Sequence, residues 1–546
     1  MYREIQNDRA PHFFWIGIAV LFITEQEKES RRVAFERHFA AMQKMKNGMR
    51  RFLSMLLAMV FIALALPACN NGSTNDTDTT DDTTEKPALT EIGNSVLSPS
   101  WYYQNPLTGS AADPMIVEHE GTYYLYSTGG TKLSVRTSKN LKTWSSSKQI
   151  FALSQTSWGV DCCWAPEVHE YNGKFYLFFC GRDSNKIFHG SVAVCDTPDG
   201  TFKPITDTPL LNFSYSVIDL SFFEDDDGKT YIFYSKDCST NKIGSKKVSQ
   251  SFGIEVSNDF TKLIGEPVLC SEPTQAWETV SGNTIWNEGP VVFKRNGTYY
   301  LLFSANYYQS KDYAVGYCTS DTVLGLYDKP KDSCILKGNG ETITGSGHCN
   351  LLFLGDEIYL TYHSHTVPPN TDGGRSLYID KLIIEADGSL HANGPTNTKQ
   401  PLPDGFNGTQ KYTGPVEISG KFADGKEQDV SVLADEVVAK GLTGIVKMAD
   451  GDSVTFKFAE AQKFNAMWVH PSRMSGYAPG TVDVVINNAY VIYDVKFSAI
   501  KGSPATVVFA KLPEGTLIEE ITLIFEKAEE QELSAISEVT FVKIEK

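Results

Sequence analysis

The chain has 546 residues, of which 41% are hydrophobic and 21% charged, and this ordinary globular composition excludes a largely disordered protein. A formal net charge of −17 gives the chain no electrostatic reason to bind nucleic acid or an anionic membrane surface, so we expect neither as a partner. The length allows roughly two to four domains, and an aromatic content of 12% is typical of strand-rich folds.

Residues 1–68 are predicted to hold an upstream segment and a lipoprotein signal peptide. An apolar run at 52–66 follows Arg50 and Arg51 and is too short to span the roughly 30 Å hydrocarbon core of a membrane. A basic start, a short apolar run and a small-residue end are typical of a secretory signal. The run ends in a Leu-Pro-Ala-Cys sequence that resembles a bacterial lipobox, in which Cys69 would be lipidated. We therefore expect a secreted bacterial lipoprotein at the outer membrane or cell surface, held to the membrane only by its lipid; a plain cleaved signal or an uncleaved anchor is the alternative.

Residues 69–98 are predicted to form an acidic linker rich in threonine and aspartate. No large apolar side chain occurs over residues 70–85, so this part cannot contribute to a core and should be a solvated tether. An acidic stretch after a lipidated cysteine resembles a surface-export signal, and a plain spacer is the alternative.

One pattern recurs five times over residues 99–403: a polar marker residue, an apolar strand, a turn that contains glycine, and an aromatic-rich strand. Asn-Gly and Asp-Gly pairs between alternating apolar runs predict β-hairpins. The intervals between successive markers are 54, 52, 69 and 60 residues, which leaves room for a four-stranded sheet in each repeat. Sheets of this kind arranged radially make a β-propeller, so we predict an all-β fold that begins with a five-bladed propeller. The five markers are Asp113, Glu167, Asp219, Glu288 and His348.

Each marker begins the predicted inner strand of a blade, so the five side chains should point towards one end of the central channel. Four carboxylates in one small space repel each other unless a cation or shifted pKa values relieve the repulsion. For Glu167 we favour the alternative of a hydrogen-bonded residue that seals the channel. A paired acid and base on either side of a sugar is what glycoside hydrolysis requires.

Four phrases of this repeat resemble the signatures of glycoside hydrolase family 43 and occur in the same order. They are Ala112-Asp113-Pro114, Trp164-Ala165-Pro166-Glu167, Ile218-Asp219 and Glu288-Gly289-Pro290. The resemblance covers roughly residues 100–400 and implies a five-bladed propeller that hydrolyses glycosidic bonds with inversion. It also implies that Asp113 is the general base acting on water, that Glu288 is the general acid at the leaving oxygen, and that Asp219 tunes and orients the acid. Leu220 is a departure, because many relatives have proline after this aspartate.

These roles make defined demands on the carboxylates. An inverting pair stands roughly 6.5–9.5 Å apart to leave room for the attacking water. Glu288 needs a raised pKa to carry a proton near neutral pH, and a neighbouring Asp219 carboxylate would raise it. Asp113 must stay ionised to take a proton from water.

The resemblance implies three further site residues and no organic cofactor. Trp164 would line the sugar pocket, with packing in the channel wall as the alternative. Arg375 would approach the acid and the substrate, with a surface ion pair as the alternative. His348 would hold a channel cation through water, commonly calcium, with an ordinary core histidine as the alternative. His363 and His365 lie on one face of a predicted strand, but they have no third ligand nearby and we do not expect a metal there.

Residues 416–546 show many short alternating strands with frequent turns, which predicts a β-sandwich after the propeller. The layout is similar to discoidin-type, galactose-binding-like domains. This similarity implies a carbohydrate-binding module in which Trp468 or Tyr477 would stack on a sugar. A purely structural domain is the alternative.

These features together predict an inverting glycoside hydrolase that cleaves O-glycosidic bonds of plant-type polysaccharides or oligosaccharides. An α-L-arabinofuranosidase or a β-xylosidase is the leading interpretation, and its partner is a carbohydrate substrate. An endo-acting arabinanase and a non-catalytic surface glycan-binding lipoprotein are the alternatives. The intact set of Asp113, Asp219 and Glu288 argues against the second alternative, because binding alone needs no such set.

Overall fold

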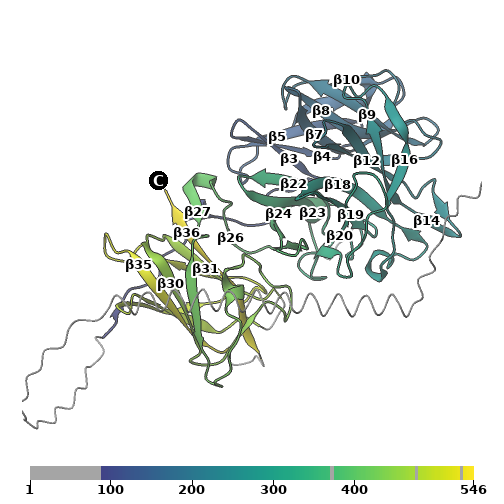
Figure 1. Cartoon of the computed structure of the whole chain (residues 1–546). Helices are drawn as coiled ribbons and strands as arrows, with labels where there is room; N and C mark the ends of the chain where they lie inside the picture. The colour runs from purple at the N-terminus through teal and green to yellow at the C-terminus, as the bar shows by residue number, and fades with distance from the viewer. Residues whose placement is uncertain (1–87, 369–373, 474–476, 529–532, 546) are drawn as a thin grey trace, which may run out of the picture. The chain divides into compact units, whose positions relative to one another are not determined.

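The computed structural model describes residues 88–368, 374–473, 477–528 and 533–545. The predicted signal peptide, Cys69 and most of the predicted linker lie outside these residues. Within the described part, no helix is long and apolar enough to cross a membrane. The described chain is all-β, as predicted, with only short 3-10 helices between its strands (Figure 1). These are η1 (Pro99–Trp101), η2 (Leu153–Gln155), η3 (Ala276–Glu278), η4 (Phe406–Gly408) and η5 (Ser431–Ala434).

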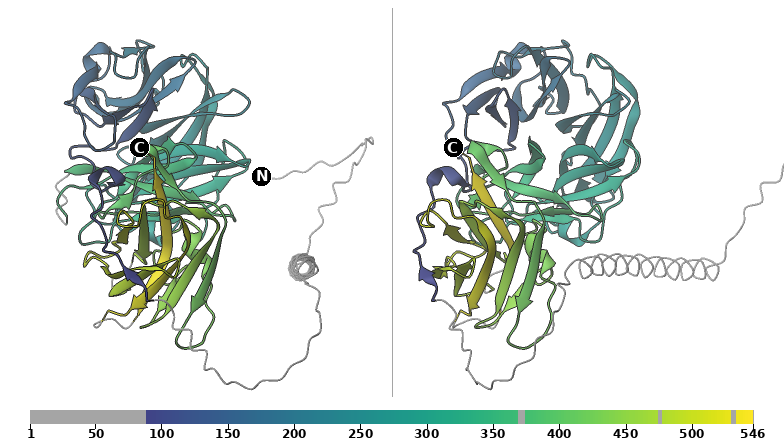
Figure 2. Two further views of the ribbon diagram at one scale, coloured as in Figure 1. Left: turned by 90° about the vertical axis from the view of Figure 1, so that its left-hand side faces the viewer. Right: turned by 60° about the vertical axis from the view of Figure 1, so that its left-hand side comes forward.

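Five four-stranded antiparallel sheets form the five blades of a propeller (Figures 1 and 2). Blade I has β3 (Met115–His119), β4 (Thr122–Ser127), β5 (Lys132–Ser138) and β6 (Lys148–Ala152). Blade II has β7 (Asp161–Tyr171), β8 (Lys174–Arg182), β9 (Phe188–Cys195) and β10 (Lys203–Pro204). Blade III has β11 (Val217–Glu224), β12 (Thr230–Lys236), β15 (Gln250–Val256) and β16 (Leu263–Ser271). Blade IV has β18 (Asn287–Arg295), β19 (Thr298–Ala305), β20 (Ala314–Ser320) and β21 (Cys334–Lys337), and blade V has β22 (Gly347–Leu354), β23 (Glu357–His365), β24 (Arg375–Ile384) and β25 (Leu390–Ala392). A small sheet of β13 (Lys242–Ile243), β14 (Lys246–Val248) and β17 (Thr284–Ile285) accompanies the blades.

The aromatic and aliphatic residues of the repeat fill the spaces between neighbouring blades. Five hydrophobic clusters occupy these spaces, each with side chains from two successive blades, and one of them joins blade V to blade I. Side chains alternate between the two faces of a strand, so each blade buries residues against both neighbours. The clusters therefore explain why the same pattern of apolar residues recurs in every repeat.

The ring is closed by pairing between the two ends of the propeller. The short strand β2 (Tyr102–Tyr103) pairs with β26 (Gln400–Pro401), and the Leu107 N–H donates to the Leu377 carbonyl at 2.9 Å. The first strands of blades V and I, β22 and β3, also contact each other directly. Residues of all five first strands line one cavity of about 650 Å³, which is the central channel.

A left-handed residue lies near the start of each first strand. These residues are Asp113 (φ 49°), Ala165 (φ 42°), Asp219 (φ 56°), Gly289 (φ 57°) and His348 (φ 50°). In blades II to V the strand pairing shifts at this residue, which is the signature of a β-bulge. Left-handed backbone costs a residue with a side chain on the order of 1 kcal/mol or more, and such strain concentrates at functional sites.

The bulge corrects the predicted equivalence of the five markers. Asp113, Asp219 and His348 share the left-handed position, but Glu288 precedes it by one residue and Glu167 follows it by two. Glu167 therefore lies two residues past the left-handed position, level with Asn350, which follows His348 by two residues. The prediction that all five markers point to one end of the channel is wrong for Glu167.

A β-sandwich forms from two further sheets around a separate hydrophobic core. One sheet has β1 (Thr90–Glu91), β33 (Tyr490–Lys496), β32 (Thr481–Ile486), β35 (Ile518–Glu526), β30 (Ser453–Gln462) and β28 (Val416–Lys421) in that order. The other has β27 (Thr409–Lys411), β36 (Ser534–Ile544), β31 (Ala466–Pro471) and β34 (Ala505–Val508), with β29 (Val446–Met448) also paired to β36. The first sheet includes a strand from the predicted linker 69–98, and the second includes one that precedes residue 416. The sandwich thus draws on chain from both sides of the propeller.

Trp468 is fully buried in the sandwich, in a cluster with Leu97 and Val542. The expectation that this side chain stacks on a sugar is therefore wrong, since an aromatic ring must be accessible to do so. A carbohydrate-binding role for the sandwich stays a prediction.

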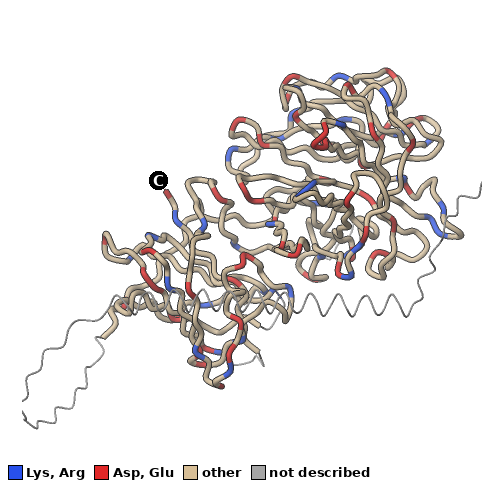
Figure 3. The backbone as a smooth tube through the Cα atoms, in the orientation of Figure 1, with Lys and Arg blue, Asp and Glu red and all other residues tan. Residues whose placement is uncertain are grey.

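Acidic and basic residues are interspersed along the described backbone (Figure 3).

Candidate active site

Three predicted carboxylates and a histidine meet where the first strands begin. The Gly289 N–H donates to Asp219 Oδ2 at 3.0 Å, which places Asp219 against the backbone next to Glu288. The His348 Nδ1 atom lies 3.5 Å from Asp113 Oδ1. Asp219 and Glu288 are each 8% exposed, so most of their surface is withdrawn from water. The propeller thus brings blades I, III, IV and V together at one cluster of titratable groups.

Asp113 is surrounded by groups that favour its ionised form. Arg375 Nη1 donates to its Oδ1 at 2.7 Å, and the Thr128 hydroxyl donates to its Oδ2 at 2.5 Å. Burial alone would raise the pKa of Asp113, but the charge of Arg375, and after it that of His348, holds that pKa well below its ordinary value. Asp113 is therefore a carboxylate throughout the neutral range.

His363 forms a neutral wall beside Asp113. Its side chain is completely buried, and its Nδ1 accepts a hydrogen bond from the Asp113 backbone N–H at 3.2 Å. Burial, reinforced by the charge of Arg375, lowers the pKa of His363 well below its ordinary value. The ring positions the backbone of Asp113 without adding a charge to the site.

Glu288 and Asp219 are pushed in the opposite direction. Burial, followed by the charge of Asp219, raises the pKa of Glu288 well above its ordinary value. Burial also raises the pKa of Asp219 to about 6, although the charge of His348 partly offsets this rise. The Tyr313 hydroxyl donates to Glu288 Oε1 at 2.9 Å and holds the carboxyl in place. The site therefore has one carboxylate held ionised and one carboxyl group held protonated, which is what paired acid and base catalysis needs.

Glu167 does not join this cluster. Its Oε1 accepts from the Asn350 side chain at 2.8 Å, and its Oε2 lies 2.8 Å from His169 Nε2. These contacts join blades II and V within the channel, in agreement with the interpretation of Glu167 as a hydrogen-bonded structural residue.

The two predicted substrate-binding residues, Trp164 and Arg375, are linked to Asp113 in different ways. Trp164 is half-buried and packs on Phe188, with ring centroids 5.0 Å apart. The following Ala165 N–H donates to the Thr128 hydroxyl at 2.9 Å, so the start of blade II is linked through Thr128 to Asp113. Arg375 contacts Asp113, whereas the sequence led us to expect it near Glu288.

The cation expected at His348 has no ready set of ligands. Among the described residues, no group of three or more His, Cys, Asp or Glu side chains is placed to hold a metal ion. Calcium takes six to eight oxygen ligands as a rule, whereas His348 Nδ1 here faces a carboxylate that Arg375 already neutralises. A cation at His348 would therefore need water to complete its ligands, as the resemblance implies, and bound calcium stays a prediction.

Three site residues escaped the sequence reasoning: Thr128, Tyr313 and His363. Tyr313 lies in an irregular loop that belongs to no repeated phrase, so no local signal pointed to it. Thr128 directly precedes a Gly-Gly pair, so its sequence context indicates only a turn. For His363 the sequence raised only the question of a metal, whereas in the structure its ring contacts Asp113.

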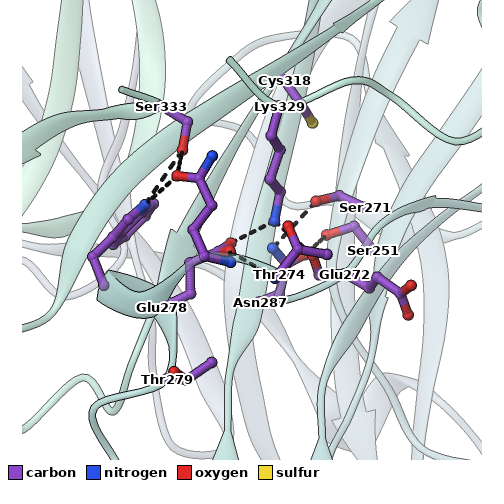
Figure 4. A network of polar contacts seen from close by, with 12 residues as sticks. Ser251, Ser271, Glu272, Thr274, Glu278, Thr279, Asn287, Cys318, Lys329 and Ser333 are labelled. Atoms are coloured by element: carbon purple, nitrogen blue, oxygen red, sulfur yellow. Dashed lines mark hydrogen bonds and ion pairs between the residues drawn. The ribbon is translucent and has the colours of Figure 1, made fainter. Parts of the chain in front are cut away.

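A buried ion pair anchors the loop that leads to Glu288 (Figure 4). The Lys329 ammonium contacts Glu278 and donates to the Glu272 carbonyl at 2.6 Å. The other Glu278 oxygen accepts from the Thr274 and Gln275 N–H groups at 2.8 and 2.6 Å. The Glu278 side chain is 0% exposed and that of Lys329 is 7% exposed. The buried Glu278 side chain and its partners therefore hold residues 272–278, which follow β16, in one conformation.

The far end of the same loop is fixed at Asn287, the residue before Glu288. Its side-chain amide donates to the Ser271 hydroxyl at 3.2 Å, and its Oδ1 accepts from the Ser251 hydroxyl at 2.8 Å (Figure 4). Asn287 is completely buried. Hydrogen bonds to two serines of blade III thus hold the start of the strand that carries Glu288.

Comparison with known proteins gives the family of this chain. The family model for glycosyl hydrolases family 43 matches residues 103–390, which is more than half of the chain. The chain belongs to glycoside hydrolase family 43. It is a glycosidase, an enzyme that hydrolyses O-glycosyl bonds.

Named relatives of this family 43 chain differ in the sugar they act on. It is 28% identical over 327 residues to a β-D-galactofuranosidase of Aspergillus niger, a match that covers 55% of this chain and 84% of the relative. It is 26% identical over 260 residues to a β-xylosidase of Xylanibacter ruminicola, covering 44% of this chain and 77% of the relative. The crystal structure of a thermostable family-43 glycoside hydrolase superposes with a TM-score of 0.53 and 38% identity, over 55% of this chain and 99% of that one.

Proposed function

We propose that this protein is an inverting glycosidase in which Asp113 is the general base, Glu288 the general acid and Asp219 the group that tunes the acid. One observation carries the proposal: the pKa of Asp113 is held low by Arg375, while that of Glu288 is raised by burial and by Asp219. The two carboxyl groups therefore start in the protonation states that a single-displacement hydrolysis requires.

The reaction follows from those states. Asp113 takes a proton from water as the water oxygen attacks the anomeric carbon from one face of the sugar. The glycosidic C–O bond breaks on the other face, and Glu288 gives its proton to the departing oxygen. Attack opposite to the leaving group inverts the anomeric configuration.

The proposed substrates are α-L-arabinofuranosides or β-D-xylosides of plant-type polysaccharides. The names of relatives support this range, since they include α-L-arabinofuranosidases of Pyricularia oryzae and Humicola insolens and the β-xylosidase of Xylanibacter ruminicola. A panel of nitrophenyl α-L-arabinofuranoside, β-D-xylopyranoside and β-D-galactofuranoside would identify the sugar. The anomeric configuration of the first product, followed by proton NMR before mutarotation, would test inversion.

The assigned roles are tested by two variants that should respond differently to the leaving group. Asp113→Asn should lower kcat by roughly 10²- to 10⁴-fold on every substrate of the panel, because no base remains to activate water. Glu288→Gln should lose activity on an oligosaccharide but keep much of it on a dinitrophenyl glycoside, whose leaving group needs little protonation. Asp226→Asn is the control, since this side chain is 83% exposed on a hairpin turn outside the site. Equal losses for Glu288→Gln on both leaving groups would contradict its role as the acid.

We also propose that the chain is secreted and carries a lipid on Cys69. The support is the sequence that ends there, a basic start followed by an apolar run and small residues, together with relatives from Streptomyces that are named as extracellular enzymes. Cells that express the chain with labelled palmitate should label the protein, and Cys69→Ser should abolish the label. Labelling of the Cys69→Ser variant to the level of the unaltered chain would overturn the proposal.

A further inference from the structure

Two connecting loops emerge side by side at the end of blade IV that carries Glu288. Strands β18 and β19 pair at Asn287 and Ala305, so the residues just before and just after this hairpin are neighbours. The Asn306 side chain joins the loops, because its amide donates to the Trp277 carbonyl at 2.8 Å and to the Asp312 carbonyl at 3.0 Å. The loops at 272–286 and 306–313 are thus held as one unit.

Three aromatic rings of these loops form a continuous row, which we call the aromatic row: Trp286, Tyr307 and Tyr308. The ring centroids of Trp286 and Tyr307 are 5.0 Å apart, and those of Tyr307 and Tyr308 are 4.8 Å apart. The Arg375 guanidinium carbon lies 4.6 Å from the centroid of the Tyr308 ring, and the same guanidinium contacts Asp113. The row therefore runs from two residues before the proposed acid to the arginine that holds the proposed base.

The row is only half-buried. All three of its rings keep an intermediate exposure, whereas Tyr313 in the same loop is completely buried. The Tyr307 hydroxyl donates to Gln309 Oε1 at 2.8 Å, which fixes the orientation of its ring. Rigid, partly open aromatic rings beside polar groups are typical of ligand-binding surfaces.

We propose that the aromatic row binds the leaving-group sugar, the unit on the far side of the bond that is cleaved. This inference rests on the proposed function, because Glu288 must reach the leaving oxygen and the leaving group must then extend past the residues that flank Glu288. An aromatic ring packs well on the C–H face of a pyranose or furanose. The preferred substrate is therefore a glycoside whose leaving group is itself a sugar, as in an oligosaccharide or a polysaccharide side chain.

The test compares two substrates that differ only in the leaving group. Xylobiose and β-D-xylosyl fluoride, or α-1,5-arabinobiose and α-L-arabinofuranosyl fluoride, share the sugar that is released, but fluoride is too small to touch the row. Trp286→Ala should lower kcat/KM for the disaccharide by roughly ten- to hundredfold and leave kcat/KM for the fluoride within about twofold. Trp286→Phe, which keeps a ring, should retain most of the activity on the disaccharide. Tyr493→Ala, which removes a ring that is 48% exposed in the sandwich, is the control and should change neither value.

The outcomes separate this inference from the proposed function. Equal loss on both substrates for Trp286→Ala would mean that the row supports the geometry of Glu288, and it would overturn the inference while the proposed function stands. No loss on either substrate would also overturn it. If the unaltered protein hydrolyses neither the disaccharide nor the fluoride of either series, the proposed function fails, and this inference fails with it.

Discussion

Replacing Lys329 by methionine should destabilise the propeller strongly, because it leaves the Glu278 carboxylate buried without its cation. Removing one partner of a buried ion pair typically costs about 3–5 kcal/mol of unfolding free energy. Glu278 keeps the Thr274 and Gln275 N–H donors, so we expect the lower end of that range, about 3 kcal/mol. For domains of this size, each kcal/mol lowers Tm by roughly 2–4 °C, which gives an expected decrease of roughly 6–12 °C.

The measurement is thermal unfolding of the full chain by differential scanning calorimetry, with two companion variants. Lys148→Met is the matched control, because Lys148 and Asp199 also form a close ion pair, of 2.8 Å, but their side chains are 58% and 39% exposed. An exposed pair contributes about 0–1 kcal/mol, so this variant should lose at most roughly 2–4 °C. The double variant Glu278→Gln with Lys329→Met removes the unpaired charge and should recover part of the loss.

The same variant should affect catalysis. The ion pair fixes the loop before Glu288, so Lys329→Met should lower kcat several-fold at a temperature where the protein is still folded. A Tm for Lys329→Met that equals that of Lys148→Met would refute the reasoning. So would a double variant that is less stable than the single one, since the cost would then not come from an unpaired carboxylate.

Three further predictions concern the acid and the bulge that places it. Asp219→Asn removes a negative charge that raises the pKa of Glu288, so the alkaline limb of the kcat/KM profile should move to lower pH by roughly one unit. Tyr313→Phe removes a hydrogen bond that favours ionised Glu288, so its alkaline limb should move to higher pH; a shift in the other direction would contradict the assigned contact. Gly289→Ala should lower the unfolding free energy by about 1–3 kcal/mol in a urea titration, because the residue is left-handed at φ 57° and a Cβ would lie 3.2 Å from a histidine ring. Gly297→Ala, at φ 84° with nothing within 4 Å, is the control for strain alone and should cost less.

The five-bladed propeller could be predicted because its signals are local. An Asn-Gly or Asp-Gly pair favours a tight turn whatever the rest of the chain does. A strand with alternating apolar residues can bury them against any neighbouring sheet. The same reasoning found Asp113, Asp219 and Glu288, because each stands in a short phrase at the start of an inner strand. The residue types in these phrases and the order of the phrases along the chain indicate the chemistry, and both can be seen without knowing how distant parts of the chain fold.

The level of each side chain in the channel depended on backbone geometry that no single phrase shows. Strand residues alternate with a period of two, but a bulge adds one residue and changes which side chain faces the axis. For this reason Glu167, which reads like Asp219 in the sequence, lies level with Asn350 instead. Trp468 illustrates the same limit, since only the tertiary packing shows that its ring is covered.

The partners of the site residues were decided by closure of the ring. Asp113 and Arg375 are 262 residues apart in the sequence, and they meet because blade V packs against blade I. Thr128, Tyr313 and His363 reach the carboxylates from three different blades. A pKa shift depends on distances of a few ångströms between such groups, so residue types alone could indicate that an acid and a base were present. Only the folded propeller, by placing Arg375 beside one carboxylate and Asp219 beside another, determines which of them holds the proton.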